Sequence, residues 1–149
     1  MKITRYQEQS AMIILLTELY FDTQKNWLSV DCLRKYTNFE TLNNEELIFL
    51  INSAVSQLID LEMIIVKSKL EKAGEYANVR MNGKAKILLD KIFGNESFIK
   101  FIDLKEKDKN NFTEYLYKKI NEDGVDIFVS FIFEGFKEIY KNTLSSIIS

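Results

Sequence analysis

The side chains best suited to specific chemistry are amides and hydroxyls on one stretch of the chain, followed closely by a run of cations. Amide groups of Asn and Gln form paired hydrogen bonds with base edges in the major groove of DNA, and Ser hydroxyls bond to them singly. Lys and Arg side chains neutralise the neighbouring phosphates. The pattern predicts a contact surface for duplex DNA, with base-reading residues Asn52, Ser53, Ser56 and Gln57 and phosphate-binding residues Lys67, Lys69, Lys72 and Arg80.

Catalytic chemistry is poorly represented, because the chain contains no histidine and a single cysteine, Cys32. Histidine is the usual general base near neutral pH, and without one Cys32 has no group to take its proton. A lone cysteine excludes an intrachain disulfide and a thiolate metal cluster, and Gly83-Lys84 lacks the other residues of a phosphate-binding loop. We therefore expect no enzyme, no cofactor and no metal, and a buried apolar role for Cys32.

The predicted base-reading residues belong to a helix expected over residues 44–61. Asn43 or Asn44 can cap its first turn, because an Asn side chain accepts a hydrogen bond from an otherwise unpaired N–H. Apolar residues recur along this stretch at helical spacing, which predicts one buried and one exposed face. We expect Leu47, Ile51, Val55 and Leu58 to be buried and Asn52, Ser56 and Gln57 to be exposed.

Three elements are expected before this helix. Apolar residues at helical spacing predict a helix over residues 6–21. Trp27-Leu28 can form a very short strand, and Ser29 can cap a short helix that reaches Tyr36.

A hairpin and another helix are expected after it. Residues 63–70 are rich in β-branched side chains and alternate, residues 71–75 suit a turn, and residues 76–81 suit the returning strand. Asn82 can cap a helix that reaches Phe93. Strict alternation in the first strand places Ile64, Val66 and Ser68 on one face and Ile65, Lys67 and Lys69 on the other.

The last third of the chain is expected to be helical again, which divides the protein into residues 1–94 and residues 95–149. Apolar residues recur every three or four positions in its final helix. Such a wide apolar face can pack on the rest of the chain, form a homodimer interface or dock a larger partner. The residues expected in this dimer or partner interface are Phe128, Phe131, Ile132, Phe136 and Tyr140.

Length and composition favour a small, mainly helical protein. The chain has 149 residues, 46% of them hydrophobic, and no proline to interrupt helices. It has neither the basic start and cleavage site of a signal peptide nor an apolar run long enough to span a bilayer. We therefore expect a cytoplasmic protein without a membrane partner.

Two stretches resemble winged helix-turn-helix regulators of the MarR and PadR kind, over about residues 10–94. In those proteins the recognition helix often closes with leucine, three residues, glycine, leucine and isoleucine, and residues 58–64 follow this pattern with Glu62 at the glycine position. Residues 81–85 are similar to the leucine-threonine-x-lysine-glycine return of their wing, with Ala85 at the glycine position. The resemblance implies a mainly α fold with a small two- or three-stranded β wing, followed by C-terminal helices as in PadR proteins.

The distribution of charge leaves two functions open. Residues 41–66 carry four carboxylates and no cation, a net charge of −4, whereas residues 67–94 carry seven cations and three carboxylates, a net charge of +4. The wing lysines favour a small transcriptional regulator that binds duplex DNA as a homodimer. Glu45, Glu46 and the net charge of −2 favour a non-catalytic interaction subunit of a larger assembly, such as a chromosome-organising or phage-defence ATPase complex.

Overall fold

The computed structural model describes residues 3–36 and 39–93, which form helices and a small three-stranded antiparallel sheet. The predicted order of elements is confirmed across this range. The helices are α1 (Arg5–Phe21), α2 (Asp31–Arg34), α3 (Asn44–Asp60) and α4 (Gly83–Phe93), the strands are β1 (Trp27–Leu28), β2 (Ile64–Leu70) and β3 (Glu75–Met81), and a short 3-10 turn, η2 (Glu71–Ala73), joins β2 to β3.

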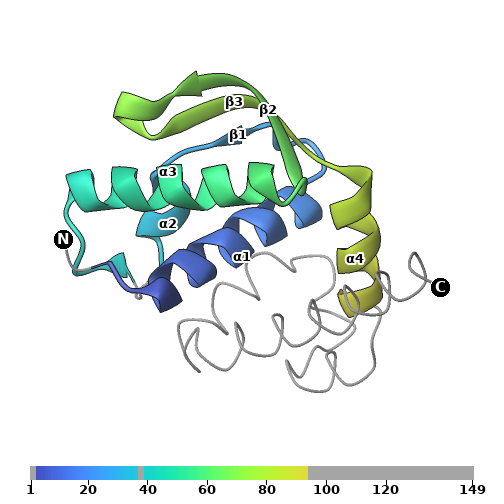
Figure 1. Ribbon diagram of the computed structural model, residues 1–149, viewed down its shortest axis with the longest axis horizontal. Coiled ribbons are helices and arrows are strands. Elements are labelled where there is room, and N and C mark those ends of the chain that lie inside the picture. The colour runs from blue at the N-terminus through green and yellow to red at the C-terminus, as the bar shows by residue number, and fades with distance from the viewer. Residues whose placement is uncertain (1–2, 37–38, 94–149) are drawn as a thin grey trace.

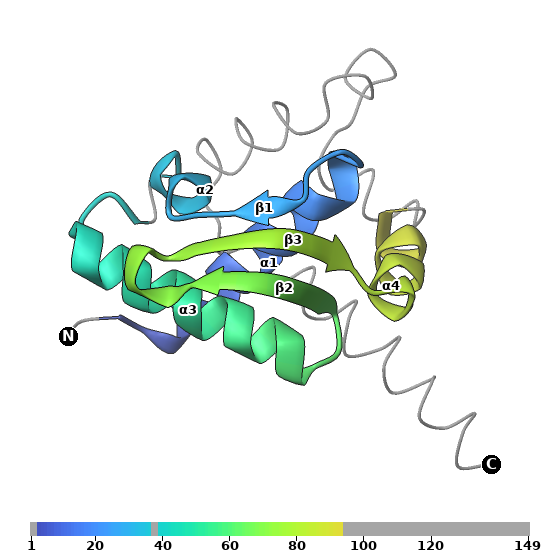
Figure 2. The ribbon, with the colours of Figure 1, turned by 90° about the horizontal axis from the view of Figure 1, so that it is seen from above.

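The sheet has the order β1-β3-β2, so β3 is central and β2 lies at an edge (Figure 2). Both neighbouring pairs are antiparallel, with Leu28 opposite Tyr76 in one pair and Val66 opposite Val79 in the other. Helices α1 and α3 lie side by side against one face of the sheet (Figure 1). The fold is therefore a two-layer arrangement whose core lies between these helices and the sheet.

Helix α1 runs through the middle of the core. Thr4 caps it, since its hydroxyl accepts from the backbone N–H of Gln7 at 3.1 Å and the Gln7 side chain accepts from the Thr4 N–H at 3.0 Å. Every residue from Ser10 to Leu19 is buried, which leaves this part of the helix without a solvent-facing side. The Tyr20 hydroxyl donates to the Asp90 carboxylate and so links the end of α1 to α4.

Helix α3 begins as expected from the sequence. The Asn43 side chain accepts from the Glu46 N–H at 2.9 Å, and the Glu46 carboxylate accepts from the Asn43 N–H at 3.1 Å. Such a reciprocal box satisfies two backbone groups that a helix start otherwise leaves unpaired. The predicted apolar stripe is confirmed, because Leu47, Ile51, Val55 and Leu58 are all buried.

The prediction that Ser29 caps α2 was wrong. The helix starts at Asp31, and its cap residue is Val30, which makes no side-chain cap hydrogen bond. Val30 already has helical backbone angles, φ −59° and ψ −26°, whereas a capping residue normally stays extended. The burial of Val30 and Leu33 in the core holds this short turn instead.

The chain leaves α3 through a left-handed residue. Helix α3 ends at Asp60, Leu61 is its cap residue, and Glu62 follows with φ 59°. The resemblance noted above places glycine at this position, and glycine is the residue that adopts such a φ without strain. Glu62 therefore keeps the backbone shape of the pattern without its usual residue.

The hairpin turn packs closely against α3. Gly74 has φ 64°, and a Cβ atom added to it would lie 3.0 Å from Cγ2 of Ile51 and 3.0 Å from Cγ1 of Val30. Glycine is required here both for the left-handed backbone and for the close approach. The turn thereby fixes the hairpin over the first half of α3.

The prediction that side chains of the hairpin alternate strictly between the two faces of the sheet was wrong in the half nearer the turn. Tyr76 and Val79 are both buried although they are three residues apart, because Asn78 between them has a positive φ of 52°. On the partner strand, Val66 lies opposite Val79 and Lys69 lies opposite Tyr76. Lys69 therefore lies on the same face of the sheet as Val66, towards α3, whereas the sequence predicted opposite faces for these two residues.

Candidate nucleic-acid interface

The exposed face of α3 is the surface that the sequence analysis predicted to contact DNA bases. Residues 45, 49, 53, 56 and 60 share this face, because positions three and four apart lie together on a helix. The helix contains no Lys or Arg. Its exposed side begins with Glu45, ends with Asp60 and carries Phe49, whose exposed fraction is 48%.

Asn52, a predicted base reader, is held within the chain. Its Nδ2 atom donates to the Glu71 carbonyl at 2.9 Å, and its Oδ1 atom accepts from the Tyr76 hydroxyl. The side chain is only partly exposed, so the expectation that it faces solvent was wrong. Its amide joins α3 to both ends of the turn between β2 and β3, and both of its hydrogen-bonding groups are occupied.

Gln57 is turned in the opposite direction, towards α1. Its Nε2 atom donates to Glu8 Oε2 at 3.2 Å and to Ser53 Oγ at 3.1 Å, and its Oε1 atom accepts from Arg5 at 3.0 Å. Gln57 is partly buried, so its predicted exposure was also wrong. The four predicted base readers do not converge: Asn52 contacts the hairpin, Ser53 and Gln57 contact each other beside α1, and Ser56 is exposed.

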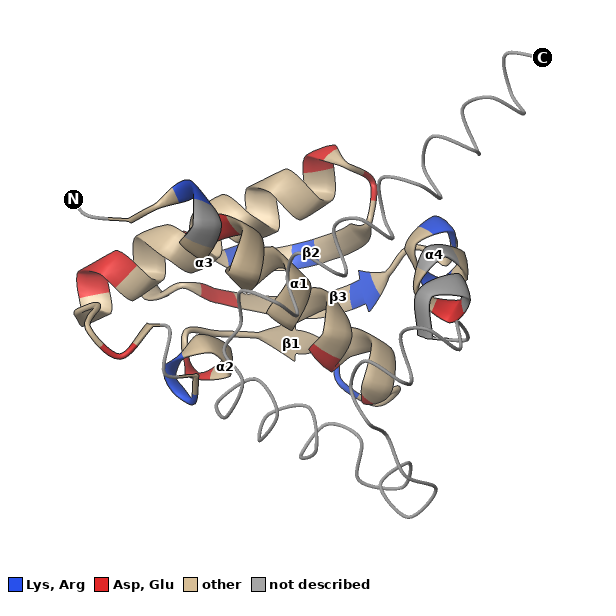
Figure 3. Ribbon diagram, turned by 90° about the horizontal axis from the view of Figure 1, so that it is seen from below, with Lys and Arg blue, Asp and Glu red and all other residues tan. Residues whose placement is uncertain are grey.

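The four predicted phosphate-binding residues lie on the hairpin and are all exposed. None of them forms an ion pair with another residue in the described part of the chain. Figure 3 shows basic segments on β2, at the end of β3 and on α4, whereas the first turn of α3 is acidic. The four residues are Lys67, Lys69, Lys72 and Arg80.

Two further cations extend this basic region and were missing from the predicted contact residues. Lys84 and Lys86 are exposed in the first turn of α4, next to the end of β3. Lys84 lies 3.8 Å from Glu62, and both of these side chains are largely exposed, so the pair is weak. The excess of lysine after Asn82 in the sequence was the signal that could have identified them.

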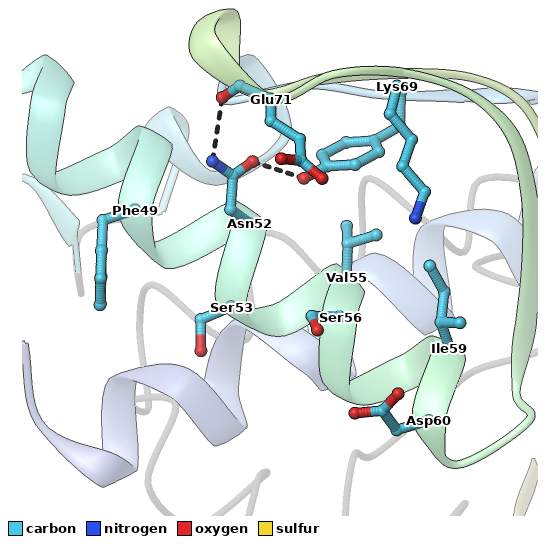
Figure 4. Close-up of a pocket in the computed structure, with 10 residues that line it drawn as sticks. Phe49, Asn52, Ser53, Val55, Ser56, Ile59, Asp60, Lys69 and Glu71 are labelled. Atoms are coloured by element: carbon cyan, nitrogen blue, oxygen red, sulfur yellow. Dashed lines mark hydrogen bonds between the residues drawn. The ribbon is translucent and has the colours of Figure 1, made fainter.

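A cleft of about 400 Å³ lies between α3 and the hairpin (Figure 4). Ile59 contributes apolar surface from the helix, buried Val55 lies beneath the cleft floor, and Lys69 points into the cleft from β2. Burial, with a smaller contribution from the Glu71 carboxylate, raises the pKa of Tyr76 to about 12, so its hydroxyl stays protonated as a donor to Asn52. The residues around the cleft are Phe49, Asn52, Ser53, Val55, Ser56, Ile59, Asp60, Lys69, Glu71 and Tyr76.

A second group of ionisable side chains surrounds Glu18, which is 4% exposed. Its carboxylate pairs with Lys25 at 3.3 Å and with Lys35 at 2.5 Å, and so joins α1 to the segments before β1 and after α2. Burial, followed by the nearby Glu18 charge, raises the pKa of Cys32 to about 11. Cys32 is buried, as predicted, and it remains a neutral thiol near neutral pH.

The expected dimer or partner residues of the final helix lie outside the described residues. Within those residues, no three His, Cys, Asp or Glu side chains cluster as metal ligands would. In the same part of the chain, no helix has the length and apolar character to cross a membrane. The chain matches no family model, no curated protein and no solved structure.

Proposed function

We propose that residues 1–94 form a winged helix that binds duplex DNA, with the hairpin as its wing. The element order α1-β1-α2-α3-β2-β3 and the small three-stranded sheet support this reading, because the resemblance described above implies a mainly α fold with a small β wing. A homodimer formed through residues 95–149 would present two such surfaces to two half-sites.

One observation carries the proposal: the hairpin holds four exposed cations that lack an ion-pair partner among the described residues. An exposed cation without a protein partner is free to displace a counterion from a phosphate. Since α3 has no cation, the hairpin and the first turn of α4 must supply the attraction. Base contact then falls to Ser56 and, after rearrangement of its bond with Gln57, to Ser53.

The test is fluorescence anisotropy with labelled duplexes, measured from low to physiological salt. Each phosphate contact contributes about 0.9 to the slope of log K against log salt, so replacing Lys67, Lys72 and Arg80 with alanine should reduce the slope by up to about 2.7. Arg5→Ala is the control, because Arg5 is an exposed cation on the opposite side of α3, beside Gln57. Absence of binding at low salt, or an equal loss in the control, would contradict the proposal.

A second candidate, a protein-interaction subunit, is favoured by the exposed face of α3. Carboxylates at both ends of this face repel phosphate, and a half-exposed Phe49 suits a protein contact better than a DNA groove. A photo-crosslinking residue at Ser56 should then capture a defined protein in the native cell, whereas the same residue at exposed Thr23 should not. Equal capture from both positions would remove this candidate.

A further inference from the structure

The cleft between α3 and the hairpin runs beside an open edge of the sheet. Strand β2 has one neighbour, β3, and seven residues in extended conformation. No described residue outside the hairpin donates a hydrogen bond to the β2 backbone or accepts one from it. An unpaired strand edge is a template for a further strand, and a groove next to the edge supplies specificity for its side chains.

The walls of the cleft suit alternating side chains of such an added strand. Its volume of about 400 Å³ falls within the roughly 300–1,000 Å³ range of ligand sites. The helix offers the apolar surface of Ile59 and the small hydroxyl of Ser56, while Phe49 lines one part of the cleft. The amide nitrogen and the amide oxygen of Asn52 each have a partner within the chain already, which lowers the cost of covering them with apolar side chains.

Charge decides which strand fits. Lys67 is the central residue of β2, and antiparallel pairing with a second copy about this residue would set Lys67 opposite Lys67 of the other copy. Like charges placed opposite each other destabilise a strand pair, whereas opposite charges stabilise it. Both lysines lack an ion-pair partner among the described residues, so Asp or Glu side chains of an incoming strand would find them available. Asp60 and Glu71 also line the cleft and disfavour acidic side chains beside them.

We propose that β2 and the α3 cleft bind an extended segment of another protein, which adds to the sheet as a fourth strand beside β2. The segment carries an apolar residue over Ile59 and acidic residues within reach of Lys69, at the β2 side of the cleft, and of exposed Lys67. This proposal does not depend on whether the hairpin binds DNA. Because Lys67 and Lys69 serve both surfaces, a bound segment would compete with a duplex.

The probe is a phage-displayed library of random linear peptides, selected against the intact protein. The selected peptides should combine apolar residues with Asp or Glu, and a synthetic copy should slow hydrogen exchange of the amides in residues 64–70. Peptide N–H groups in an added strand point alternately towards β2 and away from it. Methylating the nitrogens of one alternate set should therefore weaken binding by about tenfold or more, while methylating the other set should not.

Matched protein variants locate the site. Ser56→Trp fills the cleft from an exposed position and should reduce peptide affinity by about tenfold or more. Thr23→Trp is the control, since Thr23 is also exposed but lies between α1 and β1, outside β2 and outside the residues that line the cleft. Urea unfolding of both variants shows whether they remain folded, and Phe49→Ala provides a second, smaller change in the cleft. Failure to select any peptide, equal effects of Ser56→Trp and Thr23→Trp, or equal effects of both methylation patterns would each overturn the proposal.

Discussion

Replacing Asn52 with alanine separates a structural role of this residue from the base-reading role that the sequence suggested. In the folded protein its amide donates to the Glu71 carbonyl and accepts from the Tyr76 hydroxyl. Asn52→Ala removes both hydrogen bonds. If Asn52 holds α3 to the hairpin, the substitution should destabilise the protein whether or not any DNA is present.

The expected loss follows from what the substitution leaves behind. Glu71 is exposed, so its carbonyl can bond to water, but Tyr76 is only 4% exposed and its hydroxyl would lose its partner. A buried hydrogen-bonding group without a partner costs about 1–3 kcal/mol, which is the expected decrease in the free energy of unfolding. Tyr76→Phe should cost less, because the partly exposed Asn52 amide can bond to water instead. The double variant should then be more stable than the sum of the two single effects predicts, by about 0.5–1.5 kcal/mol.

The assay is urea unfolding followed by the fluorescence of Trp27, the single tryptophan of the chain. Ser56→Ala is the matched control on the same helix, since Ser56 is exposed, and it should change the free energy of unfolding by less than about 0.5 kcal/mol. Unchanged stability of Asn52→Ala, or additive effects of the Asn52 and Tyr76 variants, would refute the structural role and return Asn52 to the candidates for base contact.

Three further predictions concern stability and thiol chemistry. Adding glycine at left-handed Glu62 should stabilise the protein, and removing it at left-handed Gly74 should destabilise it. Glu62→Gly should raise the free energy of unfolding by about 1 kcal/mol, whereas Gly74→Ala should lower it by more than that, because the new methyl group also meets Ile51 and Val30. Urea unfolding measures both changes, and changes of the same sign would contradict the reasoning. The Cys32 thiol should react with a disulfide reagent at pH 8 about 100-fold more slowly than a free cysteine, since its pKa is raised from 9.0 to about 11. Because the folded state retains this proton, the stability that is present below pH 9 should be lost as pH rises through about 11. Cys32→Ala should show a smaller loss over the same pH range. Val55→Asp should prevent folding, because it places an unpaired carboxylate in a position that is 1% exposed, and a cooperative unfolding transition like that of the unmodified protein would contradict the assignment.

Local signals in the sequence located most elements of the described fold. A cap at Asn43 or Asn44 marked the start of α3, and the apolar spacing marked its buried side. The left-handed backbone at Glu62 was not predicted, although the resemblance places glycine at this position. Each of these signals acts within one or two helical turns, so neighbouring residues are sufficient to reveal it.

The side chains of the candidate site were harder to predict, because helical spacing gives a face but not the neighbours at its borders. Asn52 and Gln57 lie at opposite borders of the exposed face of α3, where the hairpin and α1 reach them. Their partners are far away in the sequence, 19 and 24 residues for Asn52 and 49 residues between Gln57 and Glu8. Only the packing of the elements could show that both amides were already occupied.

The left-handed Asn78 has a consequence for how the hairpin can assemble. In a regular hairpin, sliding one strand by two residues restores the inward and outward sides of both strands. In this hairpin the inward-facing and outward-facing positions change places once along each strand, at Asn78 in β3 and at Lys67 in β2. A slide of two residues would set these two points out of line with each other. A slide in one direction would also set Val79 opposite Ser68 in place of its apolar neighbour Val66. Asn78 thus favours the native alignment of the hairpin over alignments shifted by two residues.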